Sequence, residues 1–254
     1  MNLDDYVAGF PQQSPTAAES ISRLLRQAIL DGALEGGSVL RQGEIAKRFG
    51  VSRIPVREAL LKLEGEGLVE TQPRQGVVVT MLSADDFVEI LEMRYALESL
   101  ALDLAAPRFK DEDLDDALAI VIEAEKSMPT PADQDPRKEF ESRWGNLNWV
   151  FHRRLYTVAN RPRLLTSIEN LHQLFARHLR VRIDDTGTAA SASSGERHTL
   201  LEANRREWTD VLEEHRQIAL ACARHDAEAA KEILKRHIYN HGGELVRKLK
   251  ETTV

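Results

Sequence analysis

The segment FGVSRIPVREALLKLEGEGLVE, at positions 49–70, constrains the fold of this chain more tightly than any other stretch. Gly50 is typical of a helix end, and Ser52 is a favourable N-cap for a second helix directly after it. Pro55 then falls in the first helical turn, where its missing N–H removes no hydrogen bond. The apolar side chains of this second helix recur at helical spacing and predict its buried stripe: Val56, Ala59, Leu60 and Leu63.

Two more elements are predicted around this segment, a helix before it and a hairpin after it. The stretch SPTAAESISRLLRQAILDG has capping-box spacing at Thr16 and Glu19. Its apolar stripe is Ile21, Leu24, Leu25, Ala28 and Ile29, and the next helix, Gln42 to Phe49, turns Ile45, Ala46 and Phe49 inward. The run LVETQPRQGVVVT places two β-rich segments around the turn PRQG. Three short helices followed by a hairpin predict a winged helix-turn-helix.

From Ser83 onward the pattern is helical throughout. Ser83 and Asp86 are capping signals, and further helices are expected near 111–126, 138–158, 162–182, 199–224 and 226–250. Strand signals are absent after residue 80, while 128–136 and 185–197 have the composition of loops. We therefore expect a mainly α protein, with a flexible arm (1–13), a winged helix-turn-helix (14–80) and a bundle of six or so helices (83–250).

Composition narrows the possible classes. The single cysteine, Cys222, excludes an intramolecular disulfide framework and a thiolate zinc cluster. No run of eighteen apolar residues and no signal peptide are present, so a cytoplasmic protein without a membrane span is expected. The net charge of −7 does not by itself indicate nucleic-acid binding. Positive charge is nevertheless concentrated between Lys47 and Lys62, where five basic residues accompany one acid, Glu58.

The second helix of this region is therefore a candidate DNA-reading element. Its early residues Arg53 and Arg57 have the reach and spacing for base edges in a major groove, while Ser52 can donate to a phosphate. The remaining candidates are phosphate contacts at Lys47, Arg48 and Lys62 and wing contacts at Arg74 and Gln75, with Gly76 allowing the tight turn. The alternative is that both arginines are solvated surface charges.

The stretch GALEGGSVLRQGEIAKRFGVSRIPVREALLKLEGEGLVETQPRQGVVVT resembles the winged helix-turn-helix of the GntR family of bacterial transcription regulators. The patterns L-x-Q-x-x-I-A and G-V-S-R-x-P-V-R-E-A-L carry the resemblance. It implies that Gln42, Ser52, Arg53, Pro55, Arg57 and the wing tip face operator DNA. Gly43 departs from the family, in which many members have a DNA-contacting arginine at this position, so that contact should be missing.

The second half contains all eight histidines. Asn148 and His152, four residues apart, project from one helix face. His215 and His237 are 22 residues apart, and a helical hairpin turning near 225–226 would bring them side by side. With His152 they would surround a point suited to a divalent metal. The plainer alternative is that these are surface histidines or satisfied core histidines.

Residues 83–250 resemble the all-helical FCD effector domain of the FadR subgroup, through RYALESLALDLAA, NWVFHRRLY and EEHRQIALACARHDAEAAKEILKRHI. The resemblance implies a divalent metal (zinc, nickel or manganese) at Asn148, His152, His215 and His237, completed by a small carboxylate effector. The family's usual ligand at position 148 is Asp. The neutral Asn148 leaves three alternatives: weaker metal binding, binding through three histidines alone, or no metal.

Three other roles stay open. Asn148 can donate a hydrogen bond to an anionic effector instead of binding metal. Arg94 can pair with the effector's carboxylate or with Glu98, four residues on. His241, one turn after His237, is either a substitute ligand or a surface histidine.

The sequence as a whole predicts a ligand-responsive transcriptional regulator, a repressor, that binds a palindromic operator as a homodimer and answers to a small organic or sugar acid. A metal-independent regulator with a larger apolar ligand is the second hypothesis. The third is a histidine-ligated metal hydrolase. We do not expect an enzyme, because no motif supplies an obvious general base and the DNA-reading half would be unexplained.

Overall fold

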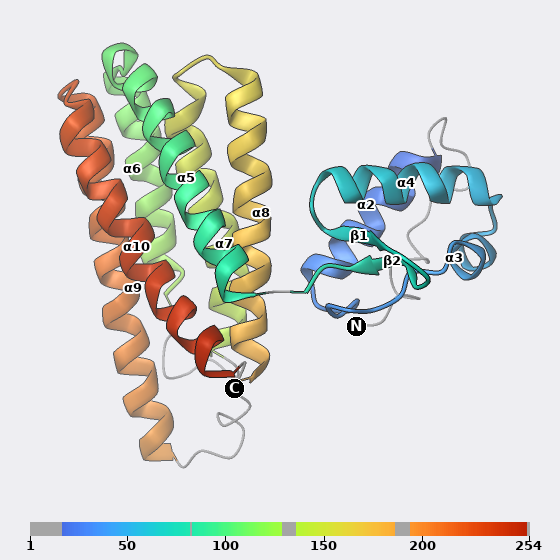
Figure 1. Ribbon diagram of the computed structural model, residues 1–254. Coiled ribbons are helices and arrows are strands. Elements are labelled where there is room, and N and C mark those ends of the chain that lie inside the picture. Colours follow the sequence, from blue (N-terminus) through green and yellow to red (C-terminus); the bar gives the residue numbers. More distant parts are fainter. Residues whose placement is uncertain (1–16, 82, 129–135, 186–193, 253–254) are drawn as a thin grey trace. The chain divides into compact units, whose positions relative to one another are not determined.

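The structure is a computed structural model that describes residues 17–81, 83–128, 136–185 and 194–252 (Figure 1). Side chains at 136–146, 178–207, 244–245, 248–249 and 251–252 are outside this description. The predicted arm over 1–13 and the capping residue Thr16 also lie outside the described residues. Contacts divide the chain into two compact units, one holding the elements up to Phe87 with Gln173–Asp184, the other holding the rest. Because the helix over 162–185 contributes to both units, the domain limits 14–80 and 83–250 stay predictions.

The N-terminal elements have the order predicted for a winged helix-turn-helix. They are α2 (Ala17–Leu30), α3 (Gln42–Phe49), α4 (Arg53–Gly65), β1 (Val69–Gln72) and β2 (Gly76–Val79). The two strands are antiparallel, with Val69 opposite Val79 and Gln72 opposite Gly76. An isolated bridge from Val39 to Val78 ties the segment before α3 to the same hairpin.

The turn between α3 and α4 forms as its residues dictate. Gly50 ends α3 in the left-handed conformation, at φ 66°, which costs glycine little because it has no Cβ. Ser52 is the N-cap of α4 with extended backbone, so the predicted helix start at Arg53 is confirmed. The Ser52 side chain makes no capping hydrogen bond, however, and its hydroxyl is exposed.

A single apolar core joins these elements. The predicted inward residues of α3 and α4 are all buried, which confirms both stripes. In α2, Leu24 is only half-buried and the rest of the predicted stripe is buried. The remaining members of the core come from the loop before α3 and from the wing: Leu40, Leu68, Val69 and Val79.

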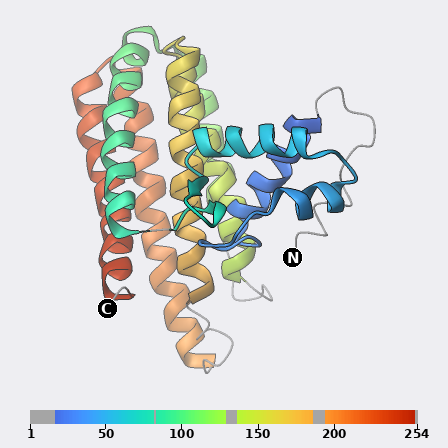
Figure 2. The same cartoon turned by 45° about the vertical axis from the view of Figure 1, so that its right-hand side comes forward.

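The second half is helical, as predicted, and the fold class is confirmed. Its elements are α5 (Ala84–Ala105), the short 3-10 helix η1 (Ala106–Arg108), α6 (Asp111–Lys126), α7 (Pro136–Thr157), α8 (Pro162–Asp185), α9 (Ser194–Ala223) and α10 (Ala227–Thr252). Within the bundle, α9 packs against α6, α7 and α10, and the long helices run side by side (Figures 1 and 2). None of the helices in the described part of the chain has the length and apolarity needed to span a membrane.

Local signals set several helix ends of the bundle. The backbone N–H of Asp86 donates to Ser83 Oγ at 3.0 Å, so the predicted cap of α5 is confirmed. The α9–α10 turn falls at the predicted place: His225 has φ 57°, and Asp226 accepts from the N–H of Ala229. The predicted loop 185–197 was too long, because α9 already begins at Ser194. Serine and glutamate are both favourable near a helix start, so small polar residues did not mark the loop end.

Candidate functional sites: a groove on the winged helix and a buried histidine cluster

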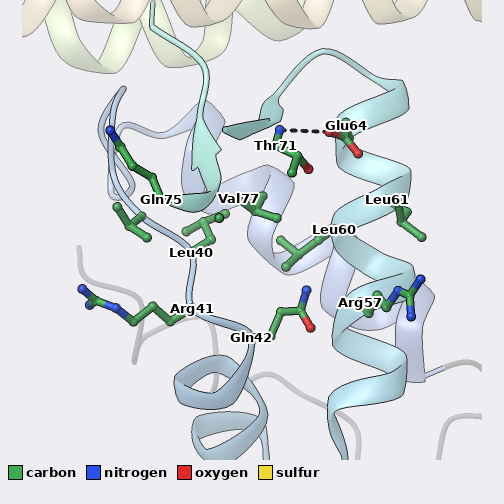
Figure 3. Close-up of a pocket in the computed structure, with 12 residues that line it drawn as sticks. Leu40, Arg41, Gln42, Arg57, Leu60, Leu61, Glu64, Thr71, Gln75 and Val77 are labelled. Atoms are coloured by element: carbon green, nitrogen blue, oxygen red, sulfur yellow. Dashed lines mark hydrogen bonds between the residues drawn. The ribbon is translucent and has the colours of Figure 1, made fainter. Parts of the chain in front are cut away.

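A groove of about 420 Å³ lies between the start of α3, the outer face of α4 and the wing (Figure 3). Figure 3 shows Gln42 and Arg57 on its two helical sides and Gln75 on its wing side. Four predicted DNA-facing residues therefore border one concave surface: Gln42, Arg57, Gln75 and Gly76.

The wing is attached to α4 by a specific hydrogen bond. The backbone N–H of Thr71 on β1 donates to Glu64 Oε1 at 2.9 Å, the dashed contact of Figure 3. At the tip, Arg74 and Gly76 have positive φ values of 71° and 90°. Because glycine adopts this conformation without strain, Gly76 allows the tight turn, which leaves Arg74 and Gln75 exposed.

The early residues of α4 project outward. Arg53 and Arg57 are exposed, Pro55 is half-buried, and the basic neighbours Lys47, Arg48 and Lys62 are also exposed. A Cβ at Gly43 would lie 3.4 Å from Arg53 Nη2, so the Arg53 guanidinium rests beside the glycine. The space next to Gly43 is therefore taken by Arg53.

Sequence reasoning overlooked Ile54. Its side chain is 70% exposed, beside Arg53 in the first turn of α4. Isoleucine at an exposed position is not unusual by itself. The available signal was its place outside the buried stripe of a helix already assigned to DNA reading.

Three helices of the bundle bring His152, His215 and His237 together, from α7, α9 and α10 in that order. Their ring centroids are 4.8 to 5.3 Å apart, and their possible ligand atoms all lie within 4.8 Å of one another. All three side chains are buried. Asn148 lies one helical turn before His152 on α7 and is half-buried.

The protonation of these histidines suits metal binding. Burial lowers the pKa of His152 and of His215 well below the ordinary value. Neighbouring His172 and His237 add to the shift of His152, and His237 and His152 add to that of His215. Burial also lowers the pKa of His237, although Glu214 opposes the shift. All three imidazoles are therefore neutral at pH 7, the form that binds a metal ion.

Hydrogen bonding leaves a nitrogen available in this cluster. His152 Nδ1 lies 3.0 Å from the Tyr156 hydroxyl, and the buried Nε2 of His152 has no hydrogen-bond partner. A buried polar atom without a partner is costly unless a ligand satisfies it. The donor set of three neutral imidazoles therefore fits a divalent metal such as zinc.

A buried ion pair borders the cluster. Arg94 Nε donates to Glu98 Oε1 at 2.7 Å, and the Tyr156 hydroxyl donates to Glu98 Oε2 at 2.5 Å. His172 Nε2 lies 3.2 Å from Glu98 Oε1. Burial alone would raise the pKa of Glu98, but Arg94, His172 and Tyr156 together hold it well below its ordinary value. Of the two partners predicted for Arg94, the structure therefore has Glu98. A contact between Arg94 and the carboxylate of an effector stays a prediction.

Several residues of this region were missed or given no role from the sequence. Glu98, His152 and His172 form a second group of possible ligand atoms, and Glu214, His237 and His241 a third. Tyr156 follows His152 by one turn, and His172 follows buried Ile168 by one turn, so both lie at inward positions of their helices. That spacing was the available signal.

Comparison with known proteins identifies the two halves. The model of the FCD domain matches residues 89–240, and the model of bacterial regulatory proteins of the gntR family matches 17–79. The chain belongs to the GntR family and carries an FCD domain. The resemblance found in the sequence is confirmed, and this GntR-family protein is a transcriptional regulator whose helix-turn-helix implies DNA binding.

Relatives span nearly the whole chain. The regulator YdhC of Bacillus subtilis is 29% identical over 215 residues, which cover 83% of this chain and 89% of YdhC. A probable D-xylose utilization operon transcriptional repressor of Paenarthrobacter nicotinovorans is 28% identical, covering 88% of this chain and 86% of its own length. The structure of McbR/YncC from E. coli has the same fold, with a TM-score of 0.65, 22% identity, and coverage of 91% of this chain and 97% of that one.

Proposed function

We propose that this regulator is a cytoplasmic repressor that binds a palindromic operator as a homodimer and is released or reoriented by a small organic or sugar acid. The observation that carries the DNA-binding part is the exposed pair Arg53 and Arg57 beside the groove between α3, α4 and the wing. The name of the D-xylose operon repressor supports repression as the mode of regulation.

In this proposal α4 enters the major groove. Arg53 and Arg57 contact guanine edges, and Ile54 contacts a thymine methyl group, since an apolar side chain fits that group. The Ser52 hydroxyl, free of a capping role, donates to a phosphate. Pro55 holds the first turn of α4, and the remaining DNA contacts come from Gln42 and the wing residues Arg74, Gln75 and Gly76.

Replacement of either arginine tests the DNA-binding part. Arg53→Ala and Arg57→Ala should each weaken operator binding by about 1–3 kcal/mol, the value of one good bidentate contact. Binding would be measured by fluorescence anisotropy at fixed salt, with circular dichroism to check the fold. Arg163→Ala, an exposed arginine on α8, is the matched control and should bind like wild type. Wild-type affinity in both α4 variants would contradict the proposal.

A homodimer is proposed because a palindromic operator requires two recognition helices. A second observation supports it: α5 presents an apolar stripe at alternating spacings of four and three residues. Met93 and Leu100 are 46% and 47% exposed, and Leu97 and Leu104 between and after them are half-buried. This spacing is that of a helix seam that packs against another helix.

The effector part rests on the histidine cluster. His152, His215 and His237 would hold a divalent metal, zinc, nickel or manganese, which would supply an open coordination position for an oxygen ligand. All of these side chains are neutral, as is Asn148. The Arg94–Glu98 pair beside them cancels internally, and Glu214, whose Oε2 lies 3.0 Å from His237 Nδ1, provides one negative charge next to the cluster. The two positive charges of the ion therefore need further compensation. A carboxylate effector would provide it, with Asn148 as a donor and Arg94 as a further contact shared with Glu98.

Effector binding would then bias the DNA-binding heads of the dimer toward one spacing. A ligand shifts such an equilibrium only through different affinity for the two states, so effector and operator must weaken each other's binding by the same factor. Titration of operator complexes with the effector, and of the effector site with operator, measures both sides of this relation.

Metal analysis separates this proposal from a metal-independent regulator. Protein purified without chelators should contain a divalent ion, and His152→Ala, His215→Ala and His237→Ala should each lower its content. His225→Ala, at the exposed α9–α10 turn, is the control. Unchanged metal content in all three variants would contradict the site. A thermal-shift screen of small carboxylic acids, with and without zinc, then identifies the effector class.

A further inference from the structure

A second group of possible metal ligands lies beside the histidine cluster, nearer the surface. Glu214 on α9 faces His237 and His241, which are one turn apart on α10. Glu214 Oε2 lies 3.0 Å from His237 Nδ1 and 3.0 Å from His241 Nε2. We call Glu214, His237 and His241 the outer set, and His152, His215 and His237 the inner set.

His237 belongs to both sets. Its ring centroid lies 5.2 Å from that of His241 on one side, and 4.8 Å and 5.3 Å from those of His215 and His152 on the other. Its Nδ1 faces Glu214, which leaves Nε2 as its other nitrogen. A neutral imidazole offers one lone pair at a time, so His237 can serve only one set at once without losing its second proton.

Exposure falls steadily along this line of side chains. The His241 side chain is 23% exposed, Glu214 13%, His237 8% and His152 0%. In the described part of the bundle, the outer set therefore connects the fully buried inner set with a partly exposed pair of ligands.

We propose that the outer set is a second, weaker site for a divalent transition-metal ion and the place where the ion binds on its way to the inner set. This inference rests on the proposed metal site at the inner set. One ion would first be held by Glu214 and His241 with Nδ1 of His237, and would then pass to the inner set as His237 changes its ligand nitrogen.

The geometry and charge of the outer set fit this role. Ligand atoms about 2.0–2.1 Å from a tetrahedral zinc lie about 3.3 Å from one another. The two separations from Glu214 Oε2, each 3.0 Å, therefore need to widen by only a few tenths of an ångström, and all possible ligand atoms of the outer set lie within 4.8 Å of one another. Glu214 contributes a carboxylate, whose Oε2 faces both imidazoles while its Oε1 lies 3.5 Å from Nε of the exposed Arg236. The outer set therefore includes an oxygen ligand, which the three imidazoles of the inner set lack.

A purely positioning role is the rival explanation. Glu214 would accept a hydrogen bond from His237 Nδ1 and so direct Nε2 to the inner metal, and loss of such a partner typically costs 10–100-fold in metal affinity. In that case His241 would be only a second donor to Glu214, and its removal would leave the rate of metal loading unchanged.

The experiment uses metal-free full-length protein and Co²⁺, whose visible absorption reports coordination. Measured by stopped flow, the wild type should load Co²⁺ in two phases. His241→Gln should lose the fast phase and load Co²⁺ about tenfold more slowly, because the activation free energy for loading would be higher. Its dissociation should slow equally, so the equilibrium affinity for Co²⁺ should stay within about threefold of wild type. Unchanged loading kinetics in His241→Gln would overturn the proposal.

Removal of the inner set provides the second arm. His152→Leu should abolish tight Co²⁺ binding and keep one weaker site, which the double variant His152→Leu/His241→Gln should lose. Because His152 is fully buried, His215→Gln serves as an alternative if His152→Leu does not fold. Absence of a weak site in both folded variants would contradict the outer set. If the wild type has no tight Co²⁺ site, or if neither substitution removes that site, the proposed metal site at the inner set is contradicted instead.

Discussion

The two candidate sites of this regulator are built in opposite ways. The residues proposed to face DNA come from one short segment and a nearby wing, and Arg53, Ile54 and Arg57 are exposed. The histidine cluster comes from helices distant in sequence and is buried among partners. Exposed side chains contribute little to folding, so they can change with the operator. Buried side chains are coupled to stability, so the proposed recognition of an effector by the histidine cluster would not be separable from the folding of the bundle.

Loss of the buried carboxylate Glu98 should give the largest effect. Glu98→Ala leaves Arg94 charged, buried and without its ion-pair partner, which should cost about 3–5 kcal/mol in the free energy of unfolding. Urea denaturation followed by circular dichroism measures this loss. Glu213→Ala, which removes an exposed partner of Arg216, is the control and should change stability by at most about 1 kcal/mol. Similar losses in the two variants would contradict the expected difference between a buried and an exposed ion pair.

Acid should destabilise the metal-free bundle well before it protonates ordinary carboxylates. His152, His215 and His237 have folded pKa values below the unfolded value of about 6.5, and that of His172 is about 4. The unfolded chain therefore binds more protons below pH 6.5. Stability is fully present above that pH and should fall by up to about 1.4 kcal/mol per histidine for each pH unit below it.

The measurement is the urea midpoint with a chelator present, between pH 7.5 and pH 5. His152→Leu, which removes one buried imidazole, should show a shallower decline. A midpoint independent of pH over this range would mean that the buried histidines are not neutral.

The exposed apolar stripe of α5 is the surface proposed to form the dimer interface. Leu100→Glu should raise the dimer dissociation constant by at least about tenfold, because a charge would enter a helix seam that buries this side chain. Sedimentation velocity measures the change. Ile122→Glu on α6 is the control, since Ile122 is similarly exposed at 44% but lies outside the stripe. Dissociation in both variants, or in neither, would argue against α5 as the dimer interface.

Ile54 should give the smallest effect. Ile54→Ser should weaken operator binding by about 1 kcal/mol without reducing stability, because the side chain is exposed in the free protein. Anisotropy with operators that carry uracil in place of thymine tests the mechanism, since uracil lacks the methyl group. Equal sensitivity of wild type and Ile54→Ser to this replacement would exclude the methyl contact.

Local rules predicted the first half of the fold well. Gly50, Ser52 and the turn PRQG act within a few residues, so helix ends and hairpin could be placed from the sequence. Counting residues from the 225–226 turn also brought His215 beside His237, because two antiparallel helices impose that register.

Packing between distant helices could not be predicted in the same way. The approach of His172 on α8 to Glu98 on α5 depends on how the bundle closes, and no local spacing encodes it. The same holds for Arg94, for which the sequence left two partners open and the structure has Glu98. The roles of the DNA-facing and metal-ligating residues stay predictions until the variants above are measured.

The hydrogen bond between Glu64 and Thr71 has a consequence for how such a regulator can respond to an effector. It fixes the wing relative to α4, so each winged helix-turn-helix would contact its half of the operator as one rigid unit. An effector would then leave the sequence preference of each half unchanged and alter only which separation between the halves is tolerated. Operators with one or two base pairs inserted at the centre should therefore distinguish the free protein from the effector-bound one, whereas changes within the halves should not.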